Sequence, residues 1–381
     1  MFNDDRILTT HTGSLPRPED LTAMVYDQID GKPVDVTALD ARIDAAVADA
    51  VAQQRAAGID IVSDGEMAKP GFMNYAANRL TGFSGAADPF ALLDMDDAPE
   101  LLVAQYGGEA GAHIRLPKCT GDVTYAGHDA VAADIARFTA ALGDSGAAAG
   151  FLPAISPGCV ALFTPDEHYG DYETYLFAVA DAMREEYKAV VDAGLMLQID
   201  SPDVPGGKHF STWCTYVADK GYAAYVELHL AALTRALDGL PADRVRLHMC
   251  WGNYAGPHLM DVALEEVLVP ALKAPVGSIS FEGANPAHEH EWELFERITL
   301  PDDKVISPGV IDTKTNVVER PELVAQRIER YAKLVGRERV QPSTDCGFGT
   351  FVGFGPVLPK VSWLKLNALG AGAELASQRL W

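Results

Sequence analysis

The chain has 381 residues, of which 48% are hydrophobic, and it carries a formal net charge of −24. This length suits one large α/β barrel with insertions, and the strong negative charge argues against binding to nucleic acid or to anionic membrane surfaces. Because no run of about 18 apolar residues occurs, we expect no membrane span.

Short β-like runs alternate with longer helical runs along the chain. The β-like runs are 7–14, 59–66, 114–124, 151–156, 196–200, 245–251, 278–282, 305–310 and 340–346. Four helical runs end just before a glycine, and these are 41–57, 172–193, 222–238 and 320–335. A glycine just past the last turn is a common stop signal for a helix. This alternation predicts parallel strands joined by helical crossovers.

The pattern predicts the α/β class and, within it, a (β/α)8 TIM barrel that forms a single domain over residues 1–381. Nine β-like runs are one too many for eight strands, so we assign run 114–124 to a hairpin outside the barrel. This hairpin belongs to an inserted hairpin and loop excursion at about residues 85–130. A doubly wound open sheet is the rival fold, but no glycine-rich dinucleotide motif follows the first strand.

Chemically capable side chains stand at the end of almost every β-like run. In a TIM barrel, the carboxyl ends of the strands and their loops meet at one face, where active sites lie. We therefore expect these residues to form one constellation in space. They are His11, Gly13, Ser14, Asp64, Glu66, Asp200, Asp203, His248, Cys250, Glu282, Asp312, Lys314, Asp345 and Cys346.

Four of these residues form a candidate metal site. His248 and Cys250 are two residues apart on a predicted strand, so their side chains point to the same face. Glu282 and Cys346 end two other predicted strands. One imidazole, two thiolates and one carboxylate are a donor set that suits zinc. The spacing alone leaves open that the cysteines are ordinary buried thiols and that Glu282 is a salt-bridge partner.

The cysteines also bear on the cellular compartment. The chain has five, which is a sparse and odd number, and its first residues show no basic segment followed by an apolar one. This combination predicts reduced thiols, a cytoplasmic location and no secretion signal. Cys119, Cys159 and Cys214 are interpreted as ordinary buried thiols.

Seven motifs together resemble one known family. In chain order they are HTGSLPRP, SDGE, QIDSPD, HMCWGN, SFEGAN, SPGVIDTK and STDCGFGT. They resemble the zinc-bearing C-terminal barrel of cobalamin-independent methionine synthase, from residue 11 to about residue 350. The resemblance implies that zinc is the cofactor and that His248, Cys250, Glu282 and Cys346 hold it. The full-length synthase has two barrels, whereas this chain is similar to the short, single-barrel branch.

The resemblance also implies a homocysteine site formed by Gly13, Ser14, Glu66 and Asp200. Two converging carboxylates suit the ammonium group of an amino acid. The alternative is that Glu66 and Asp200 pair with a basic side chain of the protein, either Arg17 or Lys69.

Four further polar residues have predicted roles in the site. His11 is expected to position the substrate or the leaving group. Asp203 and Tyr254 are candidate general acids for the departure of the leaving group. Asp345, which precedes Cys346, is expected to orient a metal ligand.

The predicted function is zinc-dependent methyl transfer to a homocysteine-type thiol. Zinc lowers the pKa of the thiol, and the thiolate then attacks the alkyl carbon. The expected partners are this small-molecule thiol and an alkyl donor. The donor stays open, because the tryptophan that serves the family's pterin is missing from the segment PAISPGCVALF. The oligomeric state also stays open.

Three alternatives use the same barrel. An epoxyalkane:coenzyme M transferase opens an epoxide with a zinc-bound thiol, and its sulfonate would need Arg17, Lys69 or Lys314. A non-catalytic zinc-binding or thiol-binding barrel would hold zinc without turnover. A relative of uroporphyrinogen decarboxylase needs no zinc and would leave His248, Cys250 and Cys346 unexplained.

Overall fold

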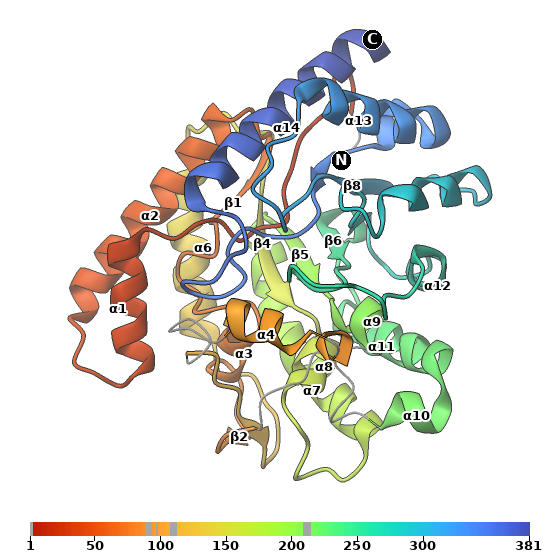
Figure 1. Ribbon diagram of the computed structural model, residues 1–381. Helices are drawn as coiled ribbons and strands as arrows, with labels where there is room; N and C mark the ends of the chain where they lie inside the picture. Colours follow the sequence, from red (N-terminus) through yellow and green to blue (C-terminus); the bar gives the residue numbers. More distant parts are fainter. Residues whose placement is uncertain (1–2, 88–92, 97, 107–112, 209–214) are drawn as a thin grey trace.

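The computed structural model describes residues 3–87, 93–96, 98–106, 113–208 and 215–381. Its centre is a parallel sheet of seven strands in the order β1-β4-β5-β6-β7-β8-β9 (Figure 1). The strands are β1 (Ile61–Ser63), β4 (Ala149–Ile155), β5 (Met196–Asp200), β6 (Val245–His248), β7 (Ser278–Phe281), β8 (Val305–Ile311) and β9 (Ser343–Thr344). The sheet runs in sequence order without a reversal, which is the topology of a barrel.

The segment 7–12 closes this sheet into a barrel. The carbonyl of Thr9 accepts a hydrogen bond from the N–H of Ile61 in β1 (2.9 Å). The N–H of Thr10 donates to the carbonyl of Pro342, just before β9 (3.0 Å). The segment therefore lies between the first and last strands and fills the eighth position. This confirms the predicted (β/α)8 barrel, although the first predicted strand forms these bonds without a regular ladder.

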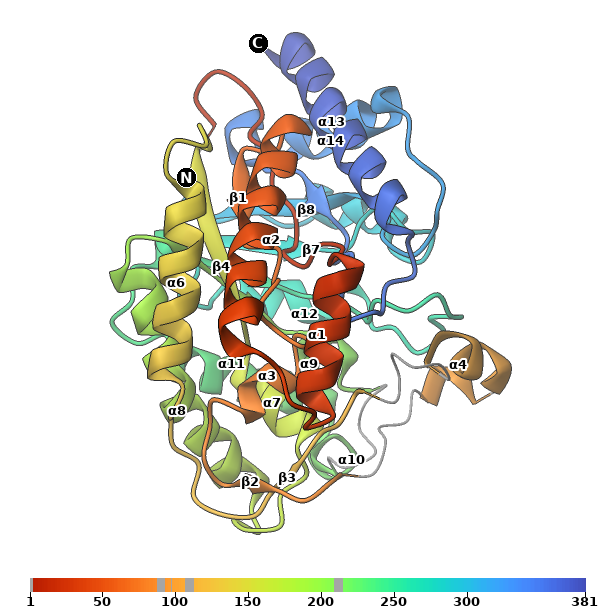
Figure 2. The same ribbon diagram turned by 90° about the vertical axis from the view of Figure 1, so that its left-hand side faces the viewer.

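Helices surround the barrel (Figures 1 and 2). They are α2 (Val36–Ala56), α6 (His128–Leu142), α8 (Tyr172–Asp192), α11 (Tyr222–Ala236), α12 (Leu264–Ala271), the 3-10 helix η3 (Glu289–Glu296), α13 (Pro321–Val335) and α14 (Pro359–Leu380). Apolar spacing explains how they pack: Val324, Ile328, Tyr331 and Val335 form one buried face of α13.

Three of the four predicted helices have both their start and their end within two residues of the predicted bounds. The exception is run 41–57, whose helix α2 begins five residues earlier, at Val36. The side chain of Asp35 accepts a hydrogen bond from the N–H of Ala38, so this aspartate caps the helix. The alanine-rich composition marks only the later part of the helix, whereas this cap sets its start.

The excursion after β1 lies outside the barrel, as predicted. β2 (Phe83–Ser84) and β3 (Lys118–Cys119) form an antiparallel pair and not a tight hairpin, and the predicted strand 114–124 is a strand only at its centre. Between them lie η1 (Leu93–Met95) and α4 (Pro99–Tyr106). The excursion ends close to the predicted bound of about residue 130, because α6 of the barrel begins at His128. Residues 88–92, 97 and 107–112 of the excursion lie outside the described part.

The remaining elements are short or peripheral. They are α1 (Glu19–Ile29), α3 (Asn74–Ala77), α7 (Pro157–Phe163), α9 (Asp203–Gly206), α10 (Tyr216–Lys220), η2 (Ala242–Arg244) and η4 (Arg337–Arg339). Cys119 and Cys159 are buried, as predicted, whereas Cys214 lies outside the described residues. Among the helices described, none is long and apolar enough to cross a membrane.

A buried arginine lies inside the barrel, below the carboxyl ends of the strands. Arg246 in β6 donates to Gln198 Oε1 (2.7 Å), to Thr10 Oγ1 (2.7 Å) and to the carbonyl of His11 (3.1 Å). Burial lowers the pKa of Arg246 to about 9. These bonds join β6, β5 and the closing segment 7–12, and they fix the strand that ends at His248.

Candidate metal and substrate site

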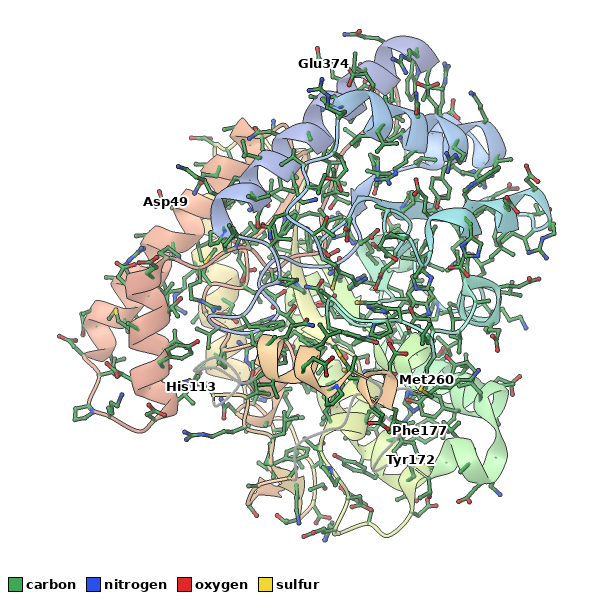
Figure 3. The ribbon with its side chains drawn as sticks, in the orientation of Figure 1. Asp49, His113, Tyr172, Phe177, Met260 and Glu374 are labelled. Carbon is green, nitrogen blue, oxygen red and sulfur yellow. The ribbon has the colours of Figure 1, made fainter. Side chains whose placement is uncertain are left out.

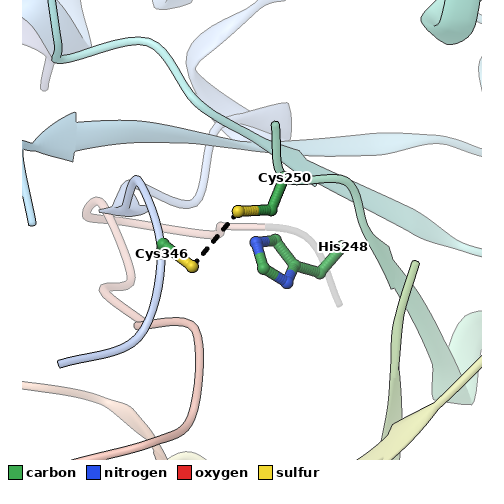
Figure 4. A group of neighbouring side chains, drawn as sticks. All are labelled: His248, Cys250 and Cys346. Atoms are coloured by element: carbon green, nitrogen blue, oxygen red, sulfur yellow. Dashed lines mark hydrogen bonds between the residues drawn. The ribbon is translucent and has the colours of Figure 1, made fainter. Parts of the chain in front are cut away.

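Three of the predicted metal ligands lie together. One ligand atom each from His248, Cys250 and Cys346 lies within 4.8 Å of the others, and all three residues are buried (Figure 4). The two Sγ atoms are 3.3 Å apart. The predicted strand 245–251 ends earlier than expected, at His248. Cys250 still reaches the cluster, because the N–H of Met249 donates to Ser280 and keeps the chain beside β7 (2.9 Å).

The imidazole of His248 is oriented for metal binding. Its Nδ1 atom lies 2.9 Å from Oδ1 of Asp200, so the ring donates its proton to that carboxylate. Its Nε2 atom is buried and has no hydrogen-bond partner. A buried nitrogen without a partner is costly unless a metal uses its lone pair. A carboxylate behind a histidine is the usual arrangement at metal sites.

The thiols of Cys250 and Cys346 also fit a metal. Their mutual contact and their burial raise the pKa of Cys250 well above its usual value. The contact between two protonated thiols stabilises the protein little. A soft cation between them would replace their protons and bind both sulfurs. Together with the free Nε2 of His248, the cluster offers one nitrogen and two sulfurs. The residues present therefore fit zinc.

Glu282, the fourth predicted ligand, is not part of this cluster. Its Oε1 atom accepts a hydrogen bond from the N–H of Trp251 (3.0 Å). Its Oε2 atom accepts from Asn285 Nδ2 (2.6 Å) and forms an ion pair with Lys314. Burial alone would raise the pKa of Glu282, but Lys314 together with His288 and His258 lowers it below its usual value.

Asp345 lies beside the loop that follows Glu282 and accepts hydrogen bonds from its backbone. Its Oδ1 atom accepts from the N–H groups of Gly283 and Ala284 (2.8 Å each), and its Oδ2 atom accepts from Asn285 (2.9 Å). Burial raises the pKa of Asp345 to about 6. The residue fixes the loop that follows β7, and it makes no hydrogen bond to a member of the metal cluster.

A cavity of about 690 Å³, counted with its open mouth, adjoins the metal cluster. Polar groups of the lining come from the ends of several strands, and aromatic side chains form much of the rest. The lining residues are Thr12, Ser14, Glu66, Phe72, Met73, Phe163, Asp200, Pro202, His248, Cys250, Gly252, Asn253, Tyr254, Cys346, Gly347, Thr350 and Phe351.

Glu66 enters the cavity from a constrained loop. Its φ angle is 59°, in the left-handed region that side-chain-bearing residues rarely adopt, and its N–H donates to Asp64 Oδ1 (3.0 Å). Burial raises the pKa of Glu66 to about 8. Gly13 faces this carboxylate at φ 134°, and a Cβ atom there would lie 3.1 Å from Glu66 Oε1. The glycine therefore leaves space for the carboxylate.

Three residues expected at the substrate make contacts with other parts of the protein. Arg17 donates to the carbonyls of Glu66 (2.8 Å), Met67 (3.2 Å) and Lys69. Lys69 Nζ donates to the carbonyl of Pro153 and lies 4.3 Å from the centre of the Tyr75 ring.

His11 is the third of these residues. It lies 2.7 Å from Gln54 Oε1, and its Nδ1 atom accepts from the N–H of Gly13 (3.2 Å). Burial lowers the pKa of His11 to about 3, so its ring is neutral. None of Arg17, Lys69 and His11 lines the cavity.

The candidate general acids have other partners. Asp203 Oδ1 accepts from the hydroxyl groups of Ser156 (2.5 Å) and Ser201 (2.8 Å), and its Oδ2 atom lies 2.6 Å from His229 Nδ1. Asp203 does not line the cavity. Tyr254 does, but its hydroxyl donates to Asp94 Oδ2 (3.1 Å).

Sequence reasoning missed several residues of the site. Asn285, which bonds to both Glu282 and Asp345, follows Glu282 by three positions, and this spacing could have suggested it. No sequence signal identifies the aromatic wall of Phe72, Phe163 and Phe351, because these residues lie in loops and in a short helix that only the fold brings together.

A barrel with a buried His-Cys-Cys cluster and a carboxylate-bearing cavity at the ends of its strands defines a class of TIM-barrel enzymes with a candidate metal site. The sequence matches the family described as cobalamin-independent synthase, catalytic domain, over residues 114–353. The chain belongs to this family. The family predicted from the motifs, and with it a methyltransferase of the methionine synthase type, is confirmed.

Curated relatives resemble the chain over almost its whole length. The methionine synthase of Saccharolobus solfataricus is 24% identical over 375 residues, which cover 98% of this chain and 95% of the relative. The methionine synthase of Sulfolobus acidocaldarius is also 24% identical and covers 98% and 93%. These matches do not favour the coenzyme M transferase, decarboxylase or non-catalytic alternatives.

Solved structures share the fold. A B12-independent methionine synthase from Shewanella sp. W3-18-1, in complex with selenomethionine, has a TM-score of 0.72 at 24% identity and covers 98% of this chain and 99% of that one. A putative vitamin-B12-independent methionine synthase from Listeria monocytogenes has a TM-score of 0.65 at 19% identity and covers 99% of each chain.

Proposed function

We propose that this protein transfers a methyl group to the sulfur of homocysteine, with zinc held by His248, Cys250 and Cys346. One observation carries the proposal: the buried nitrogen and sulfur donors open onto a cavity that holds two carboxylates, Glu66 and Asp200. The names of the curated relatives support the same reaction, and selenomethionine in the Shewanella structure resembles its product. Zinc bound at this cluster would supply the Lewis acidity that lowers the pKa of the substrate thiol.

The protein's own residues bind and orient the amino acid. Glu66 and Asp200 provide negative charge for its ammonium group, while Ser14 and the backbone near Gly13 face its carboxylate. Asp200 has a second task, because it also holds the His248 ring through Nδ1 (2.9 Å). The homocysteine sulfur then lies on the side of the cavity where Cys250 and Cys346 stand.

The reaction is an in-line displacement. The thiol gives up its proton to solvent, and the sulfur forms a bond to the methyl carbon as the bond to the leaving group breaks. The leaving group departs with the electron pair. The aromatic wall of Phe72, Phe163 and Phe351 excludes water from this region and faces the methyl donor.

The described lining of the cavity disfavours coenzyme M as the thiol. A sulfonate needs a cationic partner, but no Lys or Arg is among the described residues that line the cavity. Arg17 and Lys69 are committed to backbone carbonyls, and Lys314 pairs with Glu282. Two carboxylates favour an ammonium group instead. We also propose that residues 1–381 act as one catalytic domain, since the N-terminal segment 7–12 completes the barrel.

The test is thiol methylation by zinc-loaded protein. Homocysteine and coenzyme M are offered in parallel, each with methyltetrahydrofolate, methylcobalamin or a small epoxide, and Cys250→Ala is the control. We expect methionine from homocysteine and none from the variant. Turnover with coenzyme M and an epoxide alone would instead establish the transferase alternative.

A further inference from the structure

Two neighbouring strands place four polar side chains in two layers inside the barrel. Gln198 and Asp200 are two residues apart on β5. Arg246 and His248 are two residues apart on β6. The strand register pairs Gln198 with Arg246, and it pairs Asp200 with His248. Because residues two apart on a strand face the same side, the pair Gln198 and Arg246 lies directly below the pair that reaches the cavity.

Arg246 is a buried cation whose hydrogen bonds go to uncharged groups. It is 1% exposed. Its acceptors are Gln198 Oε1 (2.7 Å), Thr10 Oγ1 (2.7 Å) and the carbonyl of His11 (3.1 Å). Burial lowers the pKa of Arg246, and the attraction of the Asp200 carboxylate offsets only part of this effect. A buried charge without an opposite charge in contact is costly, so this arginine calls for a role.

Gln198 connects the cation to the carboxylate. Its Oε1 atom accepts from Nε of Arg246, while its Nε2 atom donates to Oδ1 of Asp200 (2.7 Å) and to the carbonyl of Thr12. An arginine can only donate, whereas a carbonyl and a carboxylate can only accept. These partners therefore fix which end of the Gln198 amide faces which neighbour.

Asp200 uses one of its two oxygens for the protein. Its Oδ1 atom accepts from Gln198 Nε2 (2.7 Å) and from Nδ1 of His248 (2.9 Å). The same residue lines the cavity. Since Oδ1 is occupied by two donors of the barrel, Oδ2 is the oxygen that would accept from the ammonium group of a ligand.

We propose that Arg246, acting through Gln198, is a positioning residue that holds Oδ1 of Asp200 toward His248 and leaves Oδ2 for the ammonium group of the substrate. The inference rests on the function proposed above. Arg246 is not among the described residues that line the cavity, so it acts only through the side chains between them. Without the guanidinium, the Gln198 amide is free to turn over. Its oxygen would then face Asp200, and the carboxylate would turn away from it.

The test compares two ligands of the zinc-saturated protein that differ in one group. Methionine, the product under the proposed function, carries the ammonium group, and 4-(methylthio)butanoate lacks it. Titrations followed by NMR measure both Kd values. Arg246→Met removes the donors but keeps a long, unbranched side chain. We expect its Kd for methionine to rise on the order of tenfold, as for the loss of a hydrogen bond to a charged group, and its Kd for the analogue to stay within about threefold.

Three further variants separate positioning from a general loss of structure. Gln198→Met breaks the link and should reproduce the selective loss of methionine binding. Arg246→Lys keeps a cation that donates to Gln198, so its methionine Kd should stay within about threefold of the wild type. Arg339→Met is the matched control. Arg339 donates to three backbone carbonyls (2.7, 3.1 and 3.0 Å) beside η4, at the opposite end of the barrel, and its loss should leave both Kd values unchanged.

Either of two results would overturn the proposal. One is a wild-type methionine Kd in Arg246→Met and Gln198→Met. The other is an equal loss of affinity for both ligands, which would show that Arg246 only supports the fold. If wild-type protein binds zinc but neither ligand, the proposed function fails. Crystal structures of the wild type and Arg246→Met then decide the inference, and an Asp200 carboxylate with the same orientation in both would contradict it.

Discussion

The carboxylate of Asp200 lies 2.9 Å from Nδ1 of His248 and also lines the substrate cavity. Its residue ends β5, and the histidine ends β6, which pairs with β5 in register at these two positions. The register of two neighbouring strands therefore couples the metal cluster to the cavity. In the proposed function, metal affinity and amino-acid binding therefore depend on the same carboxylate.

Replacing Asp200 by Asn tests this coupling. The amide can still accept the histidine proton but lacks the negative charge that strengthens the ring as a ligand. We expect zinc affinity to fall by about 10-fold to 100-fold, because outer carboxylates contribute this much at metal sites. Competition with a chromophoric chelator measures the affinity. Unchanged zinc affinity would show that Asp200 serves the cavity alone.

Glu66 predicts a pH dependence of amino-acid binding. Its pKa is raised to about 8 by burial, so at neutral pH the carboxyl is mainly protonated and cannot pair with an ammonium group. Binding must release this proton. The affinity should therefore rise with pH, by up to about tenfold per unit, and level off above the pKa of Glu66.

Methionine is the suitable ligand for this experiment, since it has no thiol to titrate. Calorimetry in two buffers of different ionisation enthalpy counts the proton released. Glu66→Gln should bind methionine weakly and without this pH dependence. A binding curve that is flat between pH 6 and pH 8, about two units in which a group of such pKa must titrate, contradicts the assignment.

We expect the substitution Gly13→Ala to weaken substrate binding. Ala at this position would need φ 134° and would place its Cβ 3.1 Å from Glu66 Oε1 and from Pro153. We expect KM for homocysteine to rise at least about tenfold, because misplacing substrate-binding groups costs this much or more, while zinc content stays normal. Gly31→Ala is the control, since Gly31 also has positive φ (69°) but nothing within 4 Å. Similar KM values for both variants would contradict the role of Gly13 in leaving space for the Glu66 carboxylate.

The helix α8 contains a buried carboxylate that supports the catalytic face. Glu186 accepts from the hydroxyls of Tyr75 (3.0 Å) and Tyr125 (2.7 Å) and pairs with Arg79 (3.2 Å). Glu186→Ala leaves the Arg79 charge buried with one partner fewer. We expect the free energy of unfolding to fall by about 3–5 kcal/mol, as for other broken buried pairs.

Urea denaturation measures the effect of Glu186→Ala. The control is Asp181→Ala. Asp181 lies on the same helix, α8, and pairs with Arg235, and the side chains of both residues are more than half exposed. Exposed pairs contribute at most about 1 kcal/mol, so this control should change stability little. Equal losses in the two variants would contradict the importance of the buried network.

Much of the fold and part of the site could be predicted from the sequence. Alternating strand and helix patterns gave the barrel, and reactive residues at strand ends gave His248, Cys250 and Cys346. Strand periodicity could not place Cys250 correctly, since β6 stops at His248 and a loop carries the cysteine to the cluster.

The contacts that charged side chains make within the protein could not be predicted from the sequence. Arg17 and Lys69 follow strand ends as a ligand-binding cation would, yet both bond to backbone carbonyls. Whether a charged side chain faces a substrate or the chain itself depends on the paths of distant loops. The partner of Glu282, Lys314, lies 32 positions away, and no local pattern links the two.

X-ray absorption at the zinc edge, with and without homocysteine, shows directly whether the substrate sulfur binds the metal. We predict zinc with two sulfur ligands and one imidazole from the cluster of His248, Cys250 and Cys346. Homocysteine should add a third sulfur ligand. Protein that retains no zinc, or zinc whose sulfur ligation is unchanged by homocysteine, would contradict this prediction.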